Sequence, residues 1–525
     1  MRPRDRRPAP LATRVALRLA LLALPAGFCA PLCGPAAAQV SGTNLLLGQV
    51  GNQPGLVPKN RQDLYDELEL DGSFGQARIG LRFESDRNSE LRNPYAGISQ
   101  RWVDWSEGPA RVRVGNFYAI LGRGLVHRSF ELPGVVLDAV GLRSRFAFAR
   151  DVDGALAEWG AGPVHALAFS GAPNAGENSL ATPTEQRYRG QLSGAEVSGS
   201  AGTHARLGAT YARSSAGLSA VEESGSGFLD VDPLGLLGAS TVSLPTYFEY
   251  AQTNGTVGDW WKLRRGGGTP HALYASTGLL WRRLGLSAEW KDYAGFRKGT
   301  NDPPSLVREQ SYVLLNRNTH VLDAGYETGY QLEVSYGLAD AVTATANVSR
   351  ADGARLNRYR ERFVELRLGP TEARAWDGAA FYDAGEDRLS ALDDSRVAGV
   401  TGGARFSGGW SAHVDLEAQR ASQTRGALPP IRFADLAAAL TVARADRGSA
   451  SVTWDRTSDP LVRSVFTGGG AYLHLVNVVL GARLSPRQDA TLTFGRSRGG
   501  RACTAGTCYE VPPFEGAELR LLSRF

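Results

Sequence analysis

The chain has 525 residues, of which 42% are apolar and 21% are charged, with a formal net charge of +5. Residues 1–38 hold six Arg and one Asp, so the rest of the chain carries 52 basic and 52 acidic groups and no net charge. This balance argues against a nucleic-acid partner, because no overall positive field would attract one.

Residues 1–38 have the three parts of a secretory signal peptide. Five arginines between Arg2 and Arg14 form a basic segment, an apolar core follows from Leu19 to Phe28, and Ala36-Ala37-Ala38 precedes a cleavage site before Gln39. The alternative is an N-terminal membrane anchor, but the apolar run is shorter than the roughly 20 residues that span a bilayer. The sequence therefore predicts a cleaved signal peptide and export.

After Gln39 the recurring pattern is strict alternation of apolar and polar residues, which is typical of strands. The clearest case is residues 330–338 and 342–348, joined by a tight turn at Ala339-Asp340-Ala341. The final residues, 518–525, alternate in the same way and end on Phe525. We expect each such segment to have one apolar and one polar face.

Alternation also fits a soluble β-sandwich or solenoid. A membrane barrel is favoured because the polar faces carry many charges, Trp and Tyr often lie at strand ends, and the last strand can close on the first. The predicted fold is an all-β transmembrane antiparallel β-barrel over residues 39–525, with roughly 18–26 strands and a central value of about 22. No plug or periplasmic domain is expected. The predicted location is the bacterial outer membrane.

Longer polar stretches between the strands predict surface loops, where binding usually occurs, and any of them could fold inward and narrow the lumen. They lie near residues 171–191, 214–238, 292–310, 383–396 and 499–513.

Two cysteines remain after the signal, Cys503 and Cys508, spaced C-T-A-G-T-C. Gly506 allows the short segment to fold back, and an oxidising compartment favours a disulfide over free thiols. We expect this disulfide to shape an exposed loop tip.

The segment Leu121-Gly-Arg-Gly-Leu125 permits a sharp bend. Arg123 and Arg128 could then project into the lumen beside Glu131. One interpretation is a salt-bridge network that braces a wide barrel, since charges inside a barrel usually need partners. The other is a charged lumen constriction that selects passing solutes.

Several segments form a set that occurs together in one order. They are residues 115–125 and 128–131, Tyr247–Tyr250, Glu289–Tyr293, 303–310, 314–320, 329–333, and the cysteine loop with Val511–Phe514. As a set they resemble an uncharacterised family of bacterial outer-membrane β-barrel proteins, a domain of unknown function. The resemblance implies a barrel and assigns no activity or functional residue.

The C-terminus resembles the signal by which the outer-membrane insertion machinery recognises its clients. Gly516, Leu519, Leu521 and Phe525 carry this resemblance, although Phe514 stands where a polar residue is usual.

No P-loop, dinucleotide fingerprint, zinc motif or nucleophile elbow is present, so no catalytic residue, metal ligand or cofactor is predicted. The leading hypothesis is a passive or loop-gated pore for small polar solutes, which is not an enzyme and whose other partners are membrane lipid and the insertion machinery. The alternative is a non-conducting scaffold whose surface loops bind a partner, lipid or polysaccharide. A barrel hydrolase ranks third, because catalytic geometry assembled across strands leaves no motif.

Overall fold

The structure is a computed structural model, which describes residues 39–525 apart from sixteen short gaps. The gaps are residues 56–60, 90–93, 140–143, 175–189, 216–220, 255–268, 297–299, 307, 309, 324–325, 355–356, 372–373, 425–428, 446, 467–469 and 505–506. The predicted signal peptide and most of the predicted loop 171–191 lie outside the described residues.

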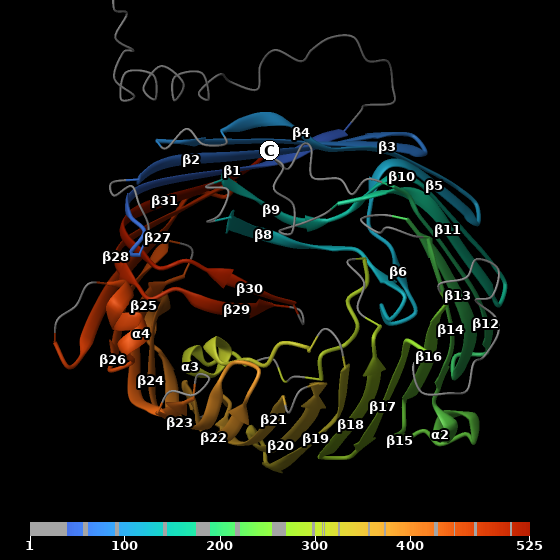
Figure 1. The fold of residues 1–525 in the computed structure, drawn as a ribbon. Helices are drawn as coiled ribbons and strands as arrows, with labels where there is room; N and C mark the ends of the chain where they lie inside the picture. Colours follow the sequence, from blue (N-terminus) through green and yellow to red (C-terminus); the bar gives the residue numbers. More distant parts are fainter. Residues whose placement is uncertain are drawn as a thin grey trace, which may run out of the picture.

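Twenty-four antiparallel strands form one closed barrel, in which each strand pairs with its neighbours along the chain and β31 pairs with β1 (Figure 1). Closure leaves no unpaired strand edge. The all-β antiparallel barrel is therefore confirmed, and the central value of 22 strands is two too few.

The first barrel strands lie between residues 39 and 294. They are β1 (Gln39–Asn52), β2 (Arg61–Phe74), β3 (Ala77–Asn88), β4 (Tyr95–Glu107), β5 (Ala110–Phe117), β10 (Val152–Ala161), β11 (Val164–Pro173), β12 (Leu192–Ala201), β13 (Ala205–Ser214), β14 (Glu222–Val231), β16 (Thr246–Asn254), β17 (His271–Trp281) and β18 (Leu284–Ala294).

The remaining barrel strands complete the ring. They are β19 (Tyr326–Ala339), β20 (Val342–Gly353), β21 (Arg358–Leu368), β22 (Trp376–Asp387), β23 (Leu392–Arg405), β24 (Trp410–Gln423), β25 (Ile431–Arg444), β26 (Gly448–Thr457), β27 (Leu473–Ser485), β28 (Gln488–Ser497) and β31 (Phe514–Arg524). A two-residue strand, β15 (Val242–Ser243), pairs with β17 beside the short helix α2 (Pro233–Leu236), and a 3-10 turn, η3 (Ser407–Gly409), joins β23 to β24.

The two ends of the barrel differ in the length of their connections. The first residues of β1 and the last residues of β31 lie at the same end of the barrel. Most connections between strands at this end are short, such as residues 75–76, 282–283 and 340–341. The connections at the other end include residues 118–151, 174–191, 255–270 and 295–325. We call these the short-turn end and the long-connection end.

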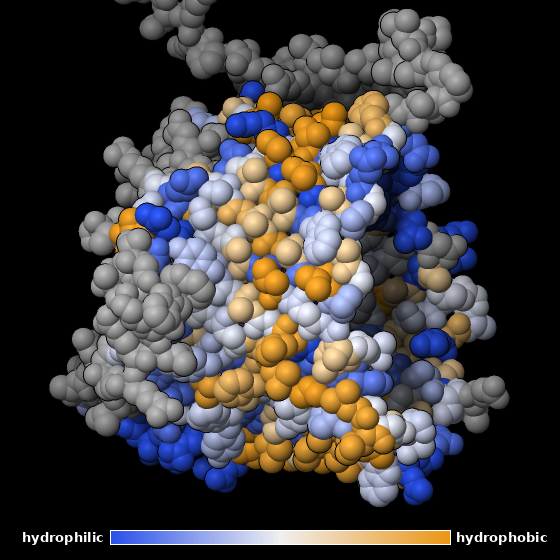
Figure 2. Space-filling view, turned by 90° about the vertical axis from the view of Figure 1, so that its right-hand side faces the viewer, coloured by the Kyte–Doolittle hydropathy of each residue, from blue (hydrophilic) through white to orange (hydrophobic). Residues whose placement is uncertain are grey.

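Apolar side chains point outward and form a band around the wall. Examples are Leu207, Leu332, Leu416 and Leu519, which are all exposed. Figure 2 shows this band between more hydrophilic residues towards the two ends, on the side that carries β11 to β14. The predicted apolar and polar faces of the strands are confirmed, because the charged partners of these residues point inward.

Exposed aromatic side chains lie near the edges of this band. Trp105, Trp281, Trp376 and Trp410 lie at the short-turn end of their strands, while Tyr382 and Tyr472 lie toward the long-connection end. Such girdles are typical of barrels that cross a bilayer. Trp260 and Trp261 lie outside the described residues.

Three of the long connections fold into the ring (Figure 1). The first insert, residues 118–151, contains β6 (Ile120–Leu121), β7 (His127–Arg128), β8 (Phe130–Ala139) and β9 (Ser144–Arg150). The second insert, residues 295–325, contains helix α3 (Val313–Arg317), and the third, residues 498–513, contains the hairpin β29 (Gly500–Thr504) and β30 (Thr507–Val511). The expected absence of a plug is not confirmed, because these inserts occupy the interior.

Two expected loops are shorter in the structure. Residues 214–238 contain β14, whose Ser- and Gly-rich sequence hides its alternation, and residues 383–396 are mostly strand, with a connection of only 388–391. The range 499–513 is a hairpin inside the ring and not an exposed loop. A last helix, α4 (Pro460–Val465), follows β26. None of the helices in the described part of the chain is long and apolar enough to cross a membrane.

Candidate functional site

The barrel interior is the candidate site, and its chemistry begins with the hairpin β8–β9 of the first insert. The carboxylate of Asp138, on β8, accepts hydrogen bonds from Arg61 Nη1 of β2 at 3.1 Å and from Gln53 Nε2, just after β1, at 2.8 Å, and lies 3.4 Å from Arg145 Nη2 of β9. Arg61 also pairs with Asp63 of β2. All four charged side chains are buried. The wall and the hairpin are thus joined by buried ion pairs, in which each charge offsets the cost of removing its partner from water.

A second group of polar residues holds the same insert against β3 and β4. Glu131 pairs with Arg82 and accepts a hydrogen bond from Tyr118 Oη at 2.6 Å. Glu84 accepts the backbone N–H of Ala147 at 3.0 Å, and Tyr95 Oη donates to the carbonyl of Arg145 at 2.5 Å. The hairpin is therefore anchored by its main chain as well as by its side chains.

The turn at residues 121–128 packs into an apolar cluster on the opposite part of the wall. Leu121 and Leu125 are fully buried against wall residues that include Phe169 and Tyr247, together with Phe296 of the second insert. Burying one such leucine contributes about 1.5–3 kcal/mol. Apolar packing therefore fixes this turn, and the glycines allow it, since Gly122 and Gly124 have positive φ angles of 57° and 89°.

His127 lies in this cluster, with its ring 4.9 Å from the ring of Phe169. Burial lowers the pKa of His127 to about 4. The side chain is therefore neutral at pH 7.

The helix α3 of the second insert is held at both ends by carboxylates of the wall. Glu417, on β24, accepts the backbone N–H groups of Val313 and Leu314, each at 2.8 Å. Arg317, in the last turn, makes two hydrogen bonds of 3.0 Å to Asp455 of β26. Each charge complements the helix end that it contacts.

His320 fixes the chain after α3. Its ring nitrogens lie 3.2 Å from Asp387 and from Glu327, and its ring stacks on Tyr359 with centroids 4.4 Å apart. Burial alone would lower the pKa of His320, but hydrogen bonds and attraction to the two carboxylates outweigh it and raise that pKa. Lys291 of β18 pairs with the same Glu327, so four buried ionisable groups lie together.

The third insert lies between the other two. Arg501 donates to the carbonyl of Thr319 at 2.7 Å, and the backbone N–H of Cys503 donates to Asn316 Oδ1 at 3.1 Å. On the other side, the ring of Tyr509 is 6.0 Å from that of Phe148 on β9. The three inserts therefore form one connected layer across the lumen.

The disulfide between Cys503 and Cys508 is present and joins β29 to β30, with Cα atoms 4.0 Å apart. The sequence-based pairing is confirmed. Its expected position is wrong, because the hairpin contacts α3 in the interior.

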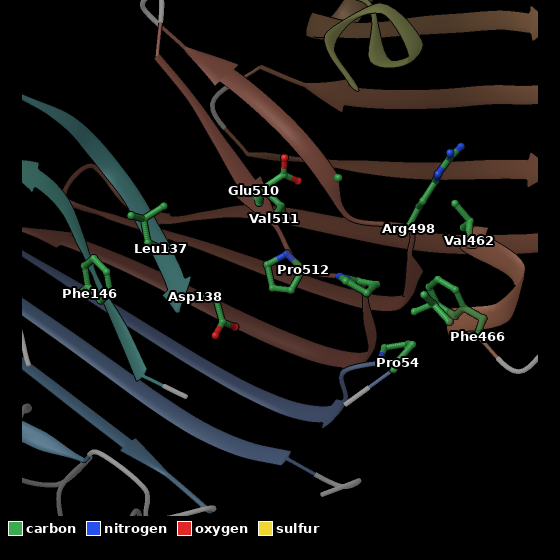
Figure 3. A pocket seen from close by; sticks show the side chains of 14 residues that line it. Pro54, Leu137, Asp138, Phe146, Val462, Phe466, Arg498, Glu510, Val511 and Pro512 are labelled. Carbon is green, nitrogen blue, oxygen red and sulfur yellow. The ribbon is translucent and has the colours of Figure 1, made fainter. Parts of the chain in front are cut away.

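A cavity of about 640 Å³ lies between the inserts and the wall at the long-connection end (Figure 3). Leu137, Asp138 and Phe146 line it from the first insert, and Glu510 with the adjacent prolines lines it from the third. Arg498, α4 with the adjacent Phe466, and Pro54 with Gly55 from the connection after β1 also line it. The cavity combines apolar walls with charges of both signs and is large enough for a small polar solute.

The three residues predicted to form a constriction do not pair with one another. Glu131 pairs with Arg82 of β3, and Arg128 pairs with Asp302 of the second insert at 2.8 Å. The guanidinium of Arg123 lies 4.6 Å from the ring of Tyr247. Two of the three charges therefore tie an insert to its surroundings, while Arg123 is exposed within the barrel.

The anchoring residues Asp138, Arg145, Glu417 and His320 were not found from the sequence. The sequence does show which charged residues alternate with the apolar residues of a strand, and this alternation identifies inward-facing carboxylates such as Glu417. Their partners lie up to 104 positions away along the chain, as Val313 does from Glu417, and no local pattern links them. Among the described residues, no group of three or more His, Cys, Asp and Glu is arranged to hold a metal ion.

No protein-family model matches the chain, so membership of the family that it resembles is not established. No curated protein matches it either. Among solved structures, the P pilus usher (PapC) translocation pore matches with 11% identity and a TM-score of 0.45, over 93% of this chain and 99% of that chain.

The siderophore receptor PirA from Pseudomonas aeruginosa matches with 10% identity and a TM-score of 0.43, over 94% of this chain and 81% of that chain. OccK2 (OpdF) from Pseudomonas aeruginosa, in complex with glucuronate, matches with 11% identity and a TM-score of 0.39, over 70% of this chain and 97% of that chain. At such identities and TM-scores these likenesses do not extend to a shared function.

Proposed function

We propose that the protein is exported through a cleaved signal peptide and acts in the bacterial outer membrane as a pore for small polar solutes. The outward apolar band with aromatic edges supports the membrane location, since a closed barrel satisfies every backbone group in lipid. Membrane lipid and the insertion machinery are the partners that this location implies.

The observation that carries the pore is the polar interior. The wall turns Asp, Glu and Arg inward along most strands, and a barrel of this width has an aqueous lumen wherever segments do not fill it. The three inserts narrow the lumen, and the 640 Å³ cavity lies between them. Solutes of small size and mixed polarity fit this lining, and Arg123 adds a charge that faces the lumen.

The third insert is the part of the layer best suited to act as a gate. Its hairpin touches the second insert through two hydrogen bonds and the first through one ring contact. The ion pairs of Arg498 with Asp435 and Asp459 lie at the base of the third insert and outside the hairpin, whereas the hairpin of the first insert is itself anchored by buried ion pairs. Movement of β29 and β30 therefore costs fewer contacts than movement of β8 and β9.

Single-channel recording in planar bilayers tests the proposal. The intact protein is expected to give a stable, salt-dependent conductance. Replacing residues 500–511 with a short Gly-Ser turn should raise that conductance, because it removes the hairpin from the lumen. Ser497 and Phe514 are paired neighbours on β28 and β31, so the turn can join these strands without disturbing the wall. The double variant C503S/C508S is the control: it removes the disulfide but keeps the hairpin in the lumen, so its conductance should stay close to that of the intact protein.

A sealed bilayer with the intact protein would overturn the pore. That outcome would support the second candidate, a non-conducting scaffold. The buried ion pairs that lock the first insert to the wall favour this candidate, because such an insert does not move aside for a solute.

A further inference from the structure

Arginines are concentrated on the outer surface of the barrel, on β20 to β26 near the long-connection end. Side chains alternate between the two faces of a strand, and this alternation places eight of the arginines outward: Arg350, Arg358, Arg360, Arg362, Arg396, Arg420, Arg432 and Arg456. Three carboxylates share this face, Asp352, Glu386 and Asp394, and each lies beside an arginine. The face therefore has a clear excess of positive charge.

The arginines lie at the edge of the apolar band. On β24, ten residues separate Trp410 at the short-turn end from Arg420, and the outward residues between them are Ala412, Val414, Leu416 and Ala418. Ten residues rise about 34 Å along a strand, or about 25 Å across the membrane at a tilt near 40°. This equals the height of the apolar band, so Arg420 lies where acyl chains meet headgroups.

Three of these arginines converge on one hollow in the outer surface, which we call the arginine patch: Arg396, Arg420 and Arg456. Arg396 and Arg420 are directly opposite each other on β23 and β24, and the guanidinium of Arg456 lies 3.8 Å from the ring of Tyr472. The hollow that they line has a volume of about 370 Å³.

Like charges directly opposite each other destabilise a sheet. Arg396 has one exposed carboxylate nearby, Asp394 at 3.5 Å, and within the described part of the chain no carboxylate forms an ion pair with Arg420 or Arg456. The patch has no role in the barrel interior. An anion from outside the protein would remove the repulsion.

An apolar groove continues from the patch toward the middle of the band. This second hollow, of about 570 Å³, is lined on its outer side by Ala380, Ala398, Val400, Leu416, Ala418, Leu436, Ala438 and Trp454. Ala398, Ala418 and Leu436 line both hollows, so they are contiguous. Four of these eight residues are alanines, whose small side chains leave the surface hollow between the larger ones.

We propose that this face binds a phosphorylated glycolipid of the outer leaflet, with its phosphates on the arginine patch and one acyl chain in the alanine-lined groove. Arginine suits the headgroup, because its planar donors bind phosphate oxygens in pairs. Long connections of outer-membrane barrels face the cell exterior, which places the patch in the outer leaflet.

A second copy of the chain is the competing occupant of an apolar outer groove. A symmetric contact would bring the two patches together and bury their like charges without partners. Charge complementarity therefore favours the lipid.

Native mass spectrometry of the detergent-solubilised barrel tests this proposal without depending on conductance. The probes are diphosphoryl lipid A, the same lipid after removal of its phosphates, and inorganic phosphate. We expect diphosphoryl lipid A to bind the wild type, and to bind the triple variant R396Q/R420Q/R456Q at least about tenfold more weakly. Ala418→Leu, which fills the groove, should weaken lipid binding and leave the charge unchanged.

The control is R405Q/R444Q/R483Q, which removes three arginines at the short-turn end, of which Arg444 faces outward, and should leave lipid binding unchanged. Equal binding by both triple variants, equal binding of the dephosphorylated lipid, or binding of inorganic phosphate alone would overturn the site. A third result would also overturn the lipid site: the wild type forms a dimer, the R396Q/R420Q/R456Q variant changes the amount of that dimer, and neither protein binds lipid. That result would assign the face to a second copy of the chain.

Discussion

Asp138 of the first insert has three partners and joins this insert to the wall. It contacts Arg61 and Gln53 of the wall region and Arg145 of its own hairpin. Because the two arginines are buried, their charges depend on this carboxylate and on Asp63.

Replacing Asp138 with Asn is expected to lower the free energy of unfolding by about 3–5 kcal/mol, since it leaves buried arginine charge without compensation. Urea titration followed by tryptophan fluorescence measures the loss. The control is Asp340→Asn, which removes an exposed carboxylate paired with Arg283 at 2.7 Å and should change stability by less than about 1 kcal/mol. Similar losses in both variants would contradict the buried network.

The two buried histidines of the inserts have opposite pH dependence. The lowered pKa of His127 means that the unfolded chain takes up a proton below pH 6.5, whereas the folded chain does so only near pH 4. Its neutral form stabilises the fold fully above pH 6.5, and this contribution is lost as the pH falls toward 4. The raised pKa of His320 acts the other way, because its contribution is present below the unfolded pKa and is lost as the pH rises through the folded pKa.

We therefore expect His127→Phe to flatten the dependence of stability on pH between 6.5 and 4, by up to about 3 kcal/mol. Urea midpoints at pH 7.5 and 4.5 for the variant and the wild type measure this difference. His474→Phe, at an exposed outward position of β27, should leave the dependence as it is. Parallel curves for His127→Phe and the wild type would refute the assignment.

Helix α3 has only five residues and is stable because the wall holds it. Glu417 supplies the acceptors for its first N–H groups, and Asp455 pairs with Arg317 in its last turn. An isolated helix of this length would not form in water. The element is thus a product of the barrel and not of its own sequence.

Glu417→Ala should destabilise α3 by about 2–4 kcal/mol, because two charge-assisted hydrogen bonds to its first N–H groups are lost, one of them buried. Hydrogen exchange at residues 313–317 should rise, together with exchange at Cys503, which α3 contacts through Asn316. Asp415→Ala is the control, since Asp415 also points inward from β24 but contacts the exposed His413. Unchanged exchange in the Glu417 variant would show that α3 is held by other contacts.

At the scale of the whole molecule, closure depends on the contact between the two ends of the ring. The main chains of Phe525 and Gly42 exchange two hydrogen bonds, of 2.9 and 3.0 Å. The ring of Phe525 lies over Gly42, where a Cβ would come within 2.7 Å of it. Leu519 and Phe525 face outward, while Gly516 lies opposite Gly51 and Gly495.

Deleting Phe525 is expected to reduce the yield of inserted barrel while export continues, because it removes both hydrogen bonds and the terminal aromatic residue of the proposed insertion signal. Heat-modifiable mobility on a gel measures the folded fraction. Phe406→Ala, at another exposed aromatic position of the short-turn end, is the control. An undiminished heat-modifiable band after the deletion would contradict this role of the C-terminus.

The sequence by itself determined the barrel, the direction of its faces and the disulfide between Cys503 and Cys508. These features follow from local rules: side chains alternate along a strand, and a five-residue separation with a glycine lets two sulfurs meet. The strand count was two too low, and one strand was taken for a loop, because Glu222–Val231 places Ser and Gly where alternating apolar residues would mark a strand.

Only the tertiary structure decided what fills the ring. Arg61 meets Asp138, Glu417 meets α3, and the cysteine hairpin turns inward, because closing the barrel brings residues of distant strands within a few ångströms. Buried charges select their partners by distance in space, and a pattern with a period of two residues carries no information about that distance.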